Sequence, residues 1–360
     1  MASILMGGRF QWGINIDDPS VYAVFRSIPV NPNSKFADQR ETLSFQRHIF
    51  TANSERTLDF GTQTDVEACA RSLLAREQCE ALGRLLKASR IDFVRCWFPW
   101  NFFDYEDYPL DLLVETLKKD GIAILAVLGS GYDRFLPKGI STQNAKSYSR
   151  KLAESSTAIV RHYRGAINMW QIENEPNWWK WHFAASWRSG RIWLSRDAEE
   201  IILSSLYNVV RSESPKSTVV INLEADGDRH RYDLYSKFCD VIGLDFYPAY
   251  TLPFRTSASR IAFAREVSRE TGVSTFVAET GYPSSPKFLG YNESRQAAYV
   301  KSACDVSYSC DAVNALCVWR LSDAGWKSFP FQENHFGLFT EKGRPKPAWT
   351  RYVNEIGKLK

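Results

Sequence analysis

The sequence predicts a single α/β domain in which eight strand–helix units close into a (β/α)8 barrel. Short apolar runs of strand length alternate with segments of helical periodicity along almost the whole chain, as expected of a parallel sheet covered by helices. Two of these runs end in a carboxylate, at Glu175 and at Glu279. Barrel proteins gather polar residues at the carboxyl ends of their strands, so the acidic ends favour a closed barrel over an open sheet.

The expected elements follow one another without a linker, repeat or low-complexity tract. Strands are expected at residues 10–17, 91–100, 122–131, 170–175, 218–226, 239–250, 273–279 and 313–326. Helices are expected at residues 65–89, 109–119, 142–163, 197–212, 257–271, 292–310 and 348–359. Residues 18–64 show Pro and Asn punctuation and no sustained period, which predicts an insertion after the first strand, at the top of the barrel.

Length and composition favour one globular domain spanning residues 1–360. The chain has 44% hydrophobic and 24% charged residues, as soluble domains do, and α/β barrels commonly exceed 250 residues. The net charge of +4 is spread over segments of mixed sign, which argues against nucleic acid or an anionic membrane as partner. The aromatic share of 14% indicates either a surface for flat ligands or a large core with aromatic filling.

The sequence predicts a cytoplasmic protein with reduced thiols. Its first ten residues lack a basic stretch followed by an apolar run of signal length, and no segment reaches the ~18 apolar residues of a membrane span. The 7 cysteines are odd in number and show no CxxC spacing. A bridge between Cys304 and Cys310 stays open as an alternative in an oxidising compartment.

Acidic residues at two strand ends are the strongest functional signal. Residues 170–179 form a buried strand running into an acidic, aromatic loop, and strand alternation would send Glu173 and Glu175 to one face. Buried carboxylates need partners, so this cluster is either a satisfied structural network or a site. Arg95 lies inside the second strand. It has a structural role if it reaches solvent or pairs with a structural carboxylate, and a functional role if its charge holds a site carboxylate in the ionised form.

Aromatic residues follow several of the same strands. Trp178 and Trp179 open a loop rich in tryptophan, whose rings suit the C–H face of a sugar or, alternatively, a hydrophobic plug or oligomer contact. Trp326 lies in a later loop expected to close the rim. Tyr247 ends the sixth strand, where it could be a core aromatic, a sugar platform or a hydroxyl donor.

With Asn174-Glu175-Pro176 closing the fourth strand and Glu279 closing the seventh, the chain resembles the clan A (GH-A) retaining glycoside hydrolases, which are built on a TIM barrel. The resemblance spans nearly the whole sequence. It implies that Glu175 is the general acid/base and that Glu279 is the nucleophile. Glu175, bordered by tryptophans, is the better placed of the two to be protonated.

The resemblance implies further roles for residues that match the clan. Arg95 and Tyr247 would keep Glu279 ionised, and Asn174 would bind the 2-hydroxyl of the sugar. Trp319 would form the floor of the subsite at the cleaved bond. The chain departs from the pattern at Asp245, because many members of the clan carry His two residues before the tyrosine, so no role is carried over to this residue.

The predicted function is therefore hydrolysis of β-linked glycosides or oligosaccharides with retention of configuration, by an exo-acting β-glycosidase. An endo-β-glucanase or endo-β-mannanase, a transglycosidase and a non-catalytic carbohydrate-binding barrel remain alternatives. No metal or cofactor is expected, since the 5 histidines show no HxH or HxxH spacing. The sequence also has no motif typical of a serine or cysteine nucleophile. Sugar specificity and oligomeric state are not predicted.

Overall fold

A computed structural model describes residues 9–16, 76–98, 110–128, 145–177, 196–225, 227, 229–247, 257–323, 331–340 and 343–360. In this part of the chain, eight parallel strands form a closed barrel in which every strand pairs with its neighbour in sequence and the last pairs with the first. The strands are β1 (Gln11–Ile16), β2 (Phe93–Trp97), β3 (Ala123–Val127), β4 (Met169–Asn174), β5 (Thr218–Glu224), β6 (Val241–Phe246), β7 (Ser274–Thr280) and β8 (Val313–Val318). The predicted (β/α)8 barrel is confirmed.

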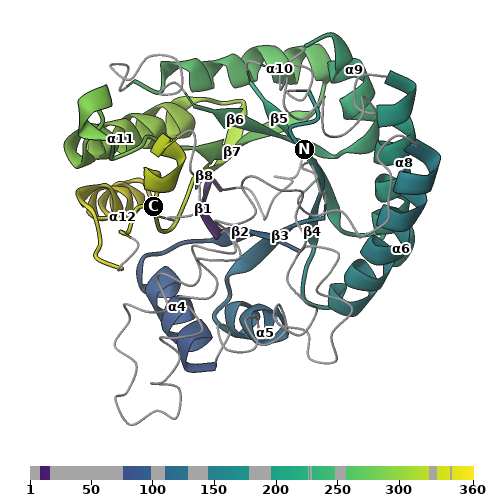
Figure 1. Cartoon of the computed structure of the whole chain (residues 1–360), viewed down its shortest axis with the longest axis horizontal. Helices are drawn as coiled ribbons and strands as arrows, with labels where there is room; N and C mark the ends of the chain where they lie inside the picture. Colours follow the sequence, from purple (N-terminus) through teal and green to yellow (C-terminus); the bar gives the residue numbers. More distant parts are fainter. Residues whose placement is uncertain are drawn as a thin grey trace.

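Helices form a ring outside the strands (Figure 1). They are α4 (Arg76–Ala88), α5 (Asp111–Lys119), α6 (Ala145–Tyr163), α8 (Arg196–Glu213), α9 (Tyr232–Tyr235), α10 (Ala264–Thr271), α11 (Glu293–Ser309) and α12 (Pro347–Leu359). Asn292 caps α11 by accepting a hydrogen bond from the backbone N–H of Arg295, and Pro347 opens α12. The predicted insertion at residues 18–64 lies outside the described residues.

One expectation about the strands was wrong. The eight expected strand–helix units included one between β5 and β6 for which the sequence gave no helix range, and the structure places α9 there, flanked by the 3-10 helices η5 (Arg229–Arg231) and η6 (Ser236–Phe238). These single turns are too short to show a periodic pattern. The second and last strands were expected to run on to residues 100 and 326, but β2 ends at Trp97 and β8 at Val318. Their apolar composition continues into the loops, so it does not mark the end of strand pairing.

The hydrophobic core has two parts, one inside the barrel and one between strands and helices. Nine buried side chains from seven strands fill the interior: Phe93, Leu125, Met169, Val220, Val241, Phe276, Ala278, Ala315 and Cys317. Gly13 of β1 makes room for this filling, because a Cβ there would lie 2.3 Å from the ring of Phe93. The interior is therefore a packed core, and polar side chains are concentrated above it.

The described residues include six of the 7 cysteines. Six cysteines, Cys79, Cys96, Cys239, Cys304, Cys310 and Cys317, are buried free thiols, so the predicted reduced state holds for these and the alternative bridge between Cys304 and Cys310 is not formed. No helix in the described ranges has the length and apolar character needed to cross a membrane.

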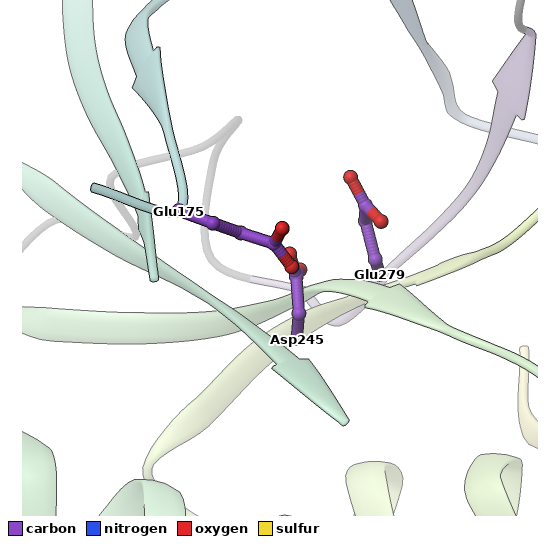
Figure 2. Close-up of side chains that lie close together, drawn as sticks. All are labelled: Glu175, Asp245 and Glu279. Carbon is purple, nitrogen blue, oxygen red and sulfur yellow. The ribbon is translucent and has the colours of Figure 1, made fainter. Parts of the chain in front are cut away.

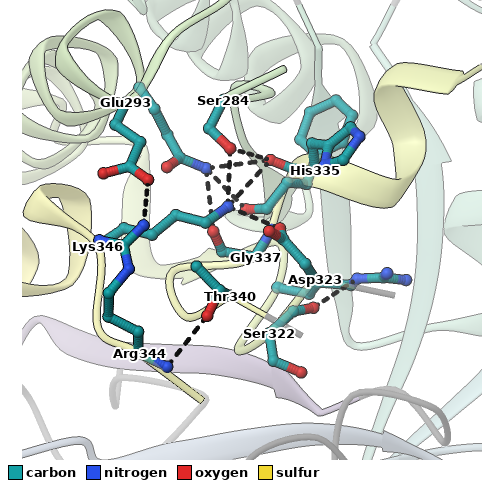
Figure 3. A network of polar contacts seen from close by, with 12 residues as sticks. Ser284, Glu293, Ser322, Asp323, His335, Gly337, Thr340, Arg344 and Lys346 are labelled. Atoms are coloured by element: carbon teal, nitrogen blue, oxygen red, sulfur yellow. Dashed lines mark hydrogen bonds and ion pairs between the residues drawn. The ribbon is translucent and has the colours of Figure 1, made fainter. Parts of the chain in front are cut away.

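A buried lysine ties together the two connections that follow β7 and β8 at the carboxyl end of the barrel (Figure 3). The Nζ of Lys346 donates to Ser284 Oγ after β7 at 2.8 Å and to Asp323 Oδ1 after β8 at 2.7 Å. Asp323 Oδ1 also accepts from the backbone N–H of Gly337 at 3.0 Å. Burial lowers the pKa of Lys346 and raises the pKa of Asp323, and their attraction opposes both shifts. The charged form of each side chain is therefore stabilised by the opposite charge of the other.

Lys346→Met should lower the free energy of unfolding by about 3–5 kcal/mol, because it leaves Asp323 buried without its counter-charge. The measurement is denaturant unfolding at pH 7. Lys301→Met is the matched control, since Lys301 forms an exposed pair with Asp305 within α11 and should show little change. Equal stability of the two variants would contradict the structural role of the Lys346 contact.

Candidate active site

Polar side chains from four strands meet at the carboxyl end of the barrel. Arg95 comes from β2, Asn174 and Glu175 from the end of β4, Asp245 and Tyr247 from β6, and Glu279 from β7. Every strand is parallel, so these ends share one rim. The structure thus brings together Arg95, Asn174, Glu175, Tyr247 and Glu279, five of the residues singled out in the sequence.

Arg95 is the centre of the polar network, although only 1% of its surface is exposed. Its Nη1 lies 2.7 Å from Glu279 Oε1 and donates to Asn15 Oδ1 at 2.8 Å. Its Nε donates to Gln171 Oε1 at 2.7 Å, and its Nη2 donates to Asn174 Oδ1 at 2.6 Å. The guanidinium is planar and always charged, so these contacts fix both its position and the negative charge of Glu279.

Glu279 receives a donor on each carboxylate oxygen. Arg95 pairs with Oε1, and the Tyr247 hydroxyl donates to Oε2 at 2.5 Å. The ring of Tyr247 is held edge-on against Phe336, with ring centres 5.5 Å apart. Hydrogen bonds to both oxygens and an adjacent positive charge favour the ionised carboxylate. Of the three sequence-based alternatives for Tyr247, the geometry supports the hydroxyl donor.

The orientation of the Asn174 amide follows from its neighbours. Its Oδ1 accepts from Arg95 Nη2, from Asn222 Nδ2 at 2.9 Å and from Gln171 Nε2 at 3.2 Å. A guanidinium can only donate, so the oxygen must face Arg95 and the amide nitrogen must face away. No described residue accepts a hydrogen bond from that nitrogen, which leaves it available to a ligand.

Glu175 is positioned by an unusual backbone turn. Its φ angle is +48°, in the left-handed region that residues with a Cβ rarely adopt. Its N–H donates to Asn222 O at 2.8 Å, and Asn177 braces the following loop by bonding both the N–H and the C=O of Glu224. Strain of this kind persists only where surrounding contacts enforce it, and it is concentrated at functional sites.

The expected strand alternation at residues 173–175 was wrong. The pairing of β4 with β5 shifts register between Gln171 and Glu173, and consequently Gln171 and Asn174 both reach Arg95 although they are three residues apart. Glu173 instead accepts from the backbone N–H of Asn174 at 2.9 Å. Glu175 is brought to the site by its left-handed turn, and not by alternation.

Asp245 is the site residue to which sequence reasoning assigned no role. It is fully buried, and its Oδ2 accepts from Asn222 Nδ2 at 2.7 Å. Burial raises the pKa of Asp245 well above its usual range; the negative charges of Glu279 and Glu175 and a hydrogen bond with Glu175 raise it further, while Arg95 lowers it. Figure 2 shows the Glu175 carboxyl directed at that of Asp245, with Glu279 beside them.

Sequence reasoning also missed the amides that support the site, Asn15, Gln171 and Asn222. Each is a buried polar residue inside an apolar strand and bonds Arg95 or Asn174. A signal for them existed, since an amide in the middle of a parallel strand needs a polar partner inside the barrel.

The three carboxylates of Glu175, Asp245 and Glu279 each place one oxygen within 4.8 Å of the others. Oxygen donors at this spacing suit a divalent cation. Both oxygens of Glu279 already have partners, however, and Arg95 supplies a positive charge where a cation would sit. We therefore assign the three carboxyl groups to proton transfer and charge stabilisation.

The aromatic residues singled out in the sequence are only partly described. Trp319 directly follows β8, is half-buried, and donates its backbone N–H to Thr280 O at 2.8 Å, which places it beside the end of β7. Trp178, Trp179 and Trp326 lie outside the described residues.

No protein-family model and no curated protein sequence matches the chain. Solved structures do match it. A family 39 glycoside hydrolase from the gut symbiont Bacteroides cellulosilyticus WH2 has a TM-score of 0.61 at 17% identity, over 78% of this chain and 61% of that one. A β-glucosidase from Thermotoga maritima has a TM-score of 0.65 at 14% identity, over 98% of this chain and 99% of that one. GH5_18 from Streptomyces cattleya, in complex with GlcNAc, has a TM-score of 0.67 at 15% identity, over 98% and 80%.

These neighbours are glycoside hydrolases, and the chain is similar to them in fold. The barrel implied by the resemblance to clan A is thereby confirmed. At identities of 14–17%, the similarity supports a shared fold and does not identify a substrate.

Because the backbone of Glu175 is left-handed, glycine should be more stable than alanine at this position. The free energy of unfolding of Glu175→Gly, measured with denaturant, should exceed that of Glu175→Ala by roughly 1 kcal/mol, because only the alanine keeps the Cβ that opposes a positive φ. Glu154, exposed within α6, is the control site: there the alanine variant should be the more stable of the two. The same order at both positions would contradict the turn.

Proposed function

We propose that the chain is a retaining glycoside hydrolase that cleaves β-linked glycosides or oligosaccharides by double displacement, with Glu279 as nucleophile and Glu175 as general acid/base. The spacing of the two carboxylates carries the proposal. They have oxygens within 4.8 Å of each other. Retaining enzymes place their carboxyl groups ~5–5.5 Å apart, whereas inverting enzymes leave ~6.5–9.5 Å for a water molecule.

The surroundings of the two glutamates support different roles. Glu279 is held by Arg95 and Tyr247, as a carboxylate that must attack an anomeric carbon should be. Glu175 lies beside the carboxyl groups of Asp245 and Glu279, and it is the group left to give the departing oxygen its proton.

The reaction follows from these positions. Glu279 attacks the anomeric carbon while Glu175 gives its proton to the departing glycosidic oxygen. A covalent glycosyl ester of Glu279 results. Glu175, now a carboxylate, takes a proton from water, and the water oxygen displaces Glu279 with a second inversion. Arg95 stays in place throughout, because Gln171, Asn15 and Asn174 hold it independently of Glu279.

Substrate contacts are assigned from the remaining groups. The outward amide nitrogen of Asn174 suits the 2-hydroxyl of the sugar at the cleaved bond, a contact that strengthens as the ring flattens. Trp319 is assigned the floor of that subsite. Among the structural neighbours, GH5_18 from Streptomyces cattleya was solved in complex with Manβ1-4GlcNAc, a β-linked disaccharide, which supports β-linked substrates here.

Exo cleavage of short substrates is the finer proposal, based on the tryptophan-rich loops that the sequence places after the fourth and eighth strands. An endo-β-glucanase or endo-β-mannanase would use the same two glutamates on a polysaccharide. Product lengths released from a β-glucan or β-mannan distinguish the two modes, since an exo enzyme releases one short product from the chain end.

Loss of the nucleophile tests the proposal directly. One aryl β-glycoside among the glucoside, galactoside, mannoside, xyloside, fucoside, glucuronide and cellobioside should be hydrolysed, and Glu279→Ala should lower its turnover roughly 10⁴-fold or more. Azide should restore turnover and yield the α-glycosyl azide, because a small anion replaces the carboxylate on one face of the sugar.

Glu270→Ala, on the exposed side of α10, should keep full activity, and EDTA should have no effect on the wild type. Loss of activity in EDTA that Ca²⁺ or Mg²⁺ reverses would instead make the carboxylate cluster a metal site. Wild-type protein that binds oligosaccharide but cleaves no glycoside would establish the non-catalytic barrel.

Replacement of the acid should give a result that depends on the leaving group. Glu175→Gln is expected to slow release of poor leaving groups about 10²–10⁴-fold, because the glycosidic oxygen receives no proton. A 2,4-dinitrophenyl glycoside needs no proton to depart, so the variant should release a burst of dinitrophenolate and accumulate the glycosyl-enzyme. Equal losses for all leaving groups would exclude Glu175 as the acid.

A further inference from the structure

We propose that Asp245 is a positioning residue that stays protonated through the reaction and donates a hydrogen bond from Oδ1 to the Glu175 carboxyl. The inference rests on the proposed function of Glu175. It goes beyond that function because Asp245 stands where the resembling clan often carries His, and the resemblance therefore assigns it nothing.

The two carboxyl oxygens of Asp245 have different surroundings. Oδ2 accepts from Asn222 Nδ2 at 2.7 Å. Oδ1 is fully buried and receives no hydrogen bond from any residue that the structure describes. A buried carboxylate oxygen without a donor is costly, whereas a protonated one becomes a donor itself. The proton therefore belongs on Oδ1.

Glu175 is the acceptor for the Asp245 proton. The Glu175 carboxyl points at the Asp245 carboxyl (Figure 2) and is within hydrogen-bonding reach of it. Two carboxylates cannot bond without a proton between them. An O–H on Asp245 satisfies both groups, and it fixes one oxygen of Glu175 so that the other is the oxygen exposed to substrate.

The groups around Asp245 are mostly acidic. The titratable and charged groups that face Asp245 are Glu175 at the end of β4, Glu279 on β7, Arg95 on β2, Tyr247 just after its own strand and Glu224 opposite it on β5. Among these described groups, Arg95 is the one cation, and Glu279 already balances it. An ionised Asp245 would add an uncompensated negative charge at a fully buried position, so the neutral form is favoured.

Every proton in the two reaction steps is accounted for when Asp245 is protonated. Glu175 gives the proton on its substrate-facing oxygen to the glycosidic oxygen and recovers one from water in the second step. Asp245 keeps its own proton in both steps. Its O–H stabilises the Glu175 carboxylate while the glycosyl-enzyme exists, and its neutrality adds no repulsion to the anionic Glu279 while the nucleophile attacks.

The protonated state can be measured without any activity. In protein labelled at the aspartate carboxyl carbon, the ¹³C signal that disappears in Asp245→Asn should titrate well above the ordinary aspartate range. In Glu175→Gln the same signal should titrate at lower pH, because the repulsion and the carboxylate acceptor are removed. Glu270→Gln, distant from the site, should leave it unchanged. An Asp245 signal with an ordinary midpoint, or one unmoved by Glu175→Gln, would overturn the inference even if the enzyme is active.

Stability supplies a second measurement. A carboxyl with a raised pKa in the folded state binds a proton that the unfolded chain releases, so folding becomes less favourable as pH rises above ~4. Asp245→Asn removes this penalty. The melting temperature of the variant relative to wild type should therefore increase steadily from pH 4 toward pH 8. A constant difference over this range would show an ordinary, ionised aspartate.

Kinetics then test the action on Glu175. Asp245→Asn keeps a neutral donor and should retain kcat/KM within roughly 10-fold, whereas Asp245→Ala lacks the donor and should lose about 100-fold or more. In wild type, kcat/KM should fall at alkaline pH as Glu175 loses its proton, and Asp245→Asn should move this fall to a different pH because a neutral amide replaces the carboxyl beside Glu175. Equal losses in the two variants, with unchanged pH profiles, would make Asp245 merely structural. If wild type cleaves no glycoside, the proposed function fails, and the carbon signal still decides whether Asp245 is protonated and coupled to Glu175.

Discussion

The ion pair between Arg95 and Glu279 is the constraint on which the rest of the site depends. A guanidinium buried above a packed barrel interior is tolerated only when its donors are satisfied, and Asn15, Gln171, Asn174 and Glu279 supply the acceptors from three different strands. The same contacts decide which way the amides point. One buried charge therefore orients the carboxylate that we propose as nucleophile and the amide that we propose to bind substrate.

Three carboxyl groups share this rim, and their surroundings separate them. Glu279 is compensated by Arg95 and Tyr247, Asp245 is deeply buried with one amide donor, and Glu175 has a left-handed backbone at the end of β4. Asn222 links two of the environments, because its Nδ2 donates both to Asn174 and to Asp245. Division of roles among chemically similar side chains thus arises from partners and burial.

The barrel makes this arrangement possible by separating apolar and polar layers. Phe93, Met169 and Phe276 fill the interior below, while Arg95 and Glu279 follow two or three residues later on the same strands. Loops above the site are tied down by the buried Lys346–Asp323 pair, which joins the ends of β7 and β8. Rigid strands below and fixed loops above hold the carboxylates at a spacing that suits displacement at a sugar carbon.

The sequence by itself determined the barrel and most of the residues at its rim, because hydrophobic periodicity and acidic strand ends are local properties of the chain. Glu175, Glu279, Arg95, Asn174 and Tyr247 could all be named from where they fall relative to the strands. Only the tertiary structure decided how they are held. The register shift in β4, the positive φ of Glu175 and the supporting amides depend on pairing with β5 and on the position of Arg95. The protonation of Asp245 depends on burial and on charges more than 30 residues away in sequence, at Glu279 and Glu175, which no local pattern encodes.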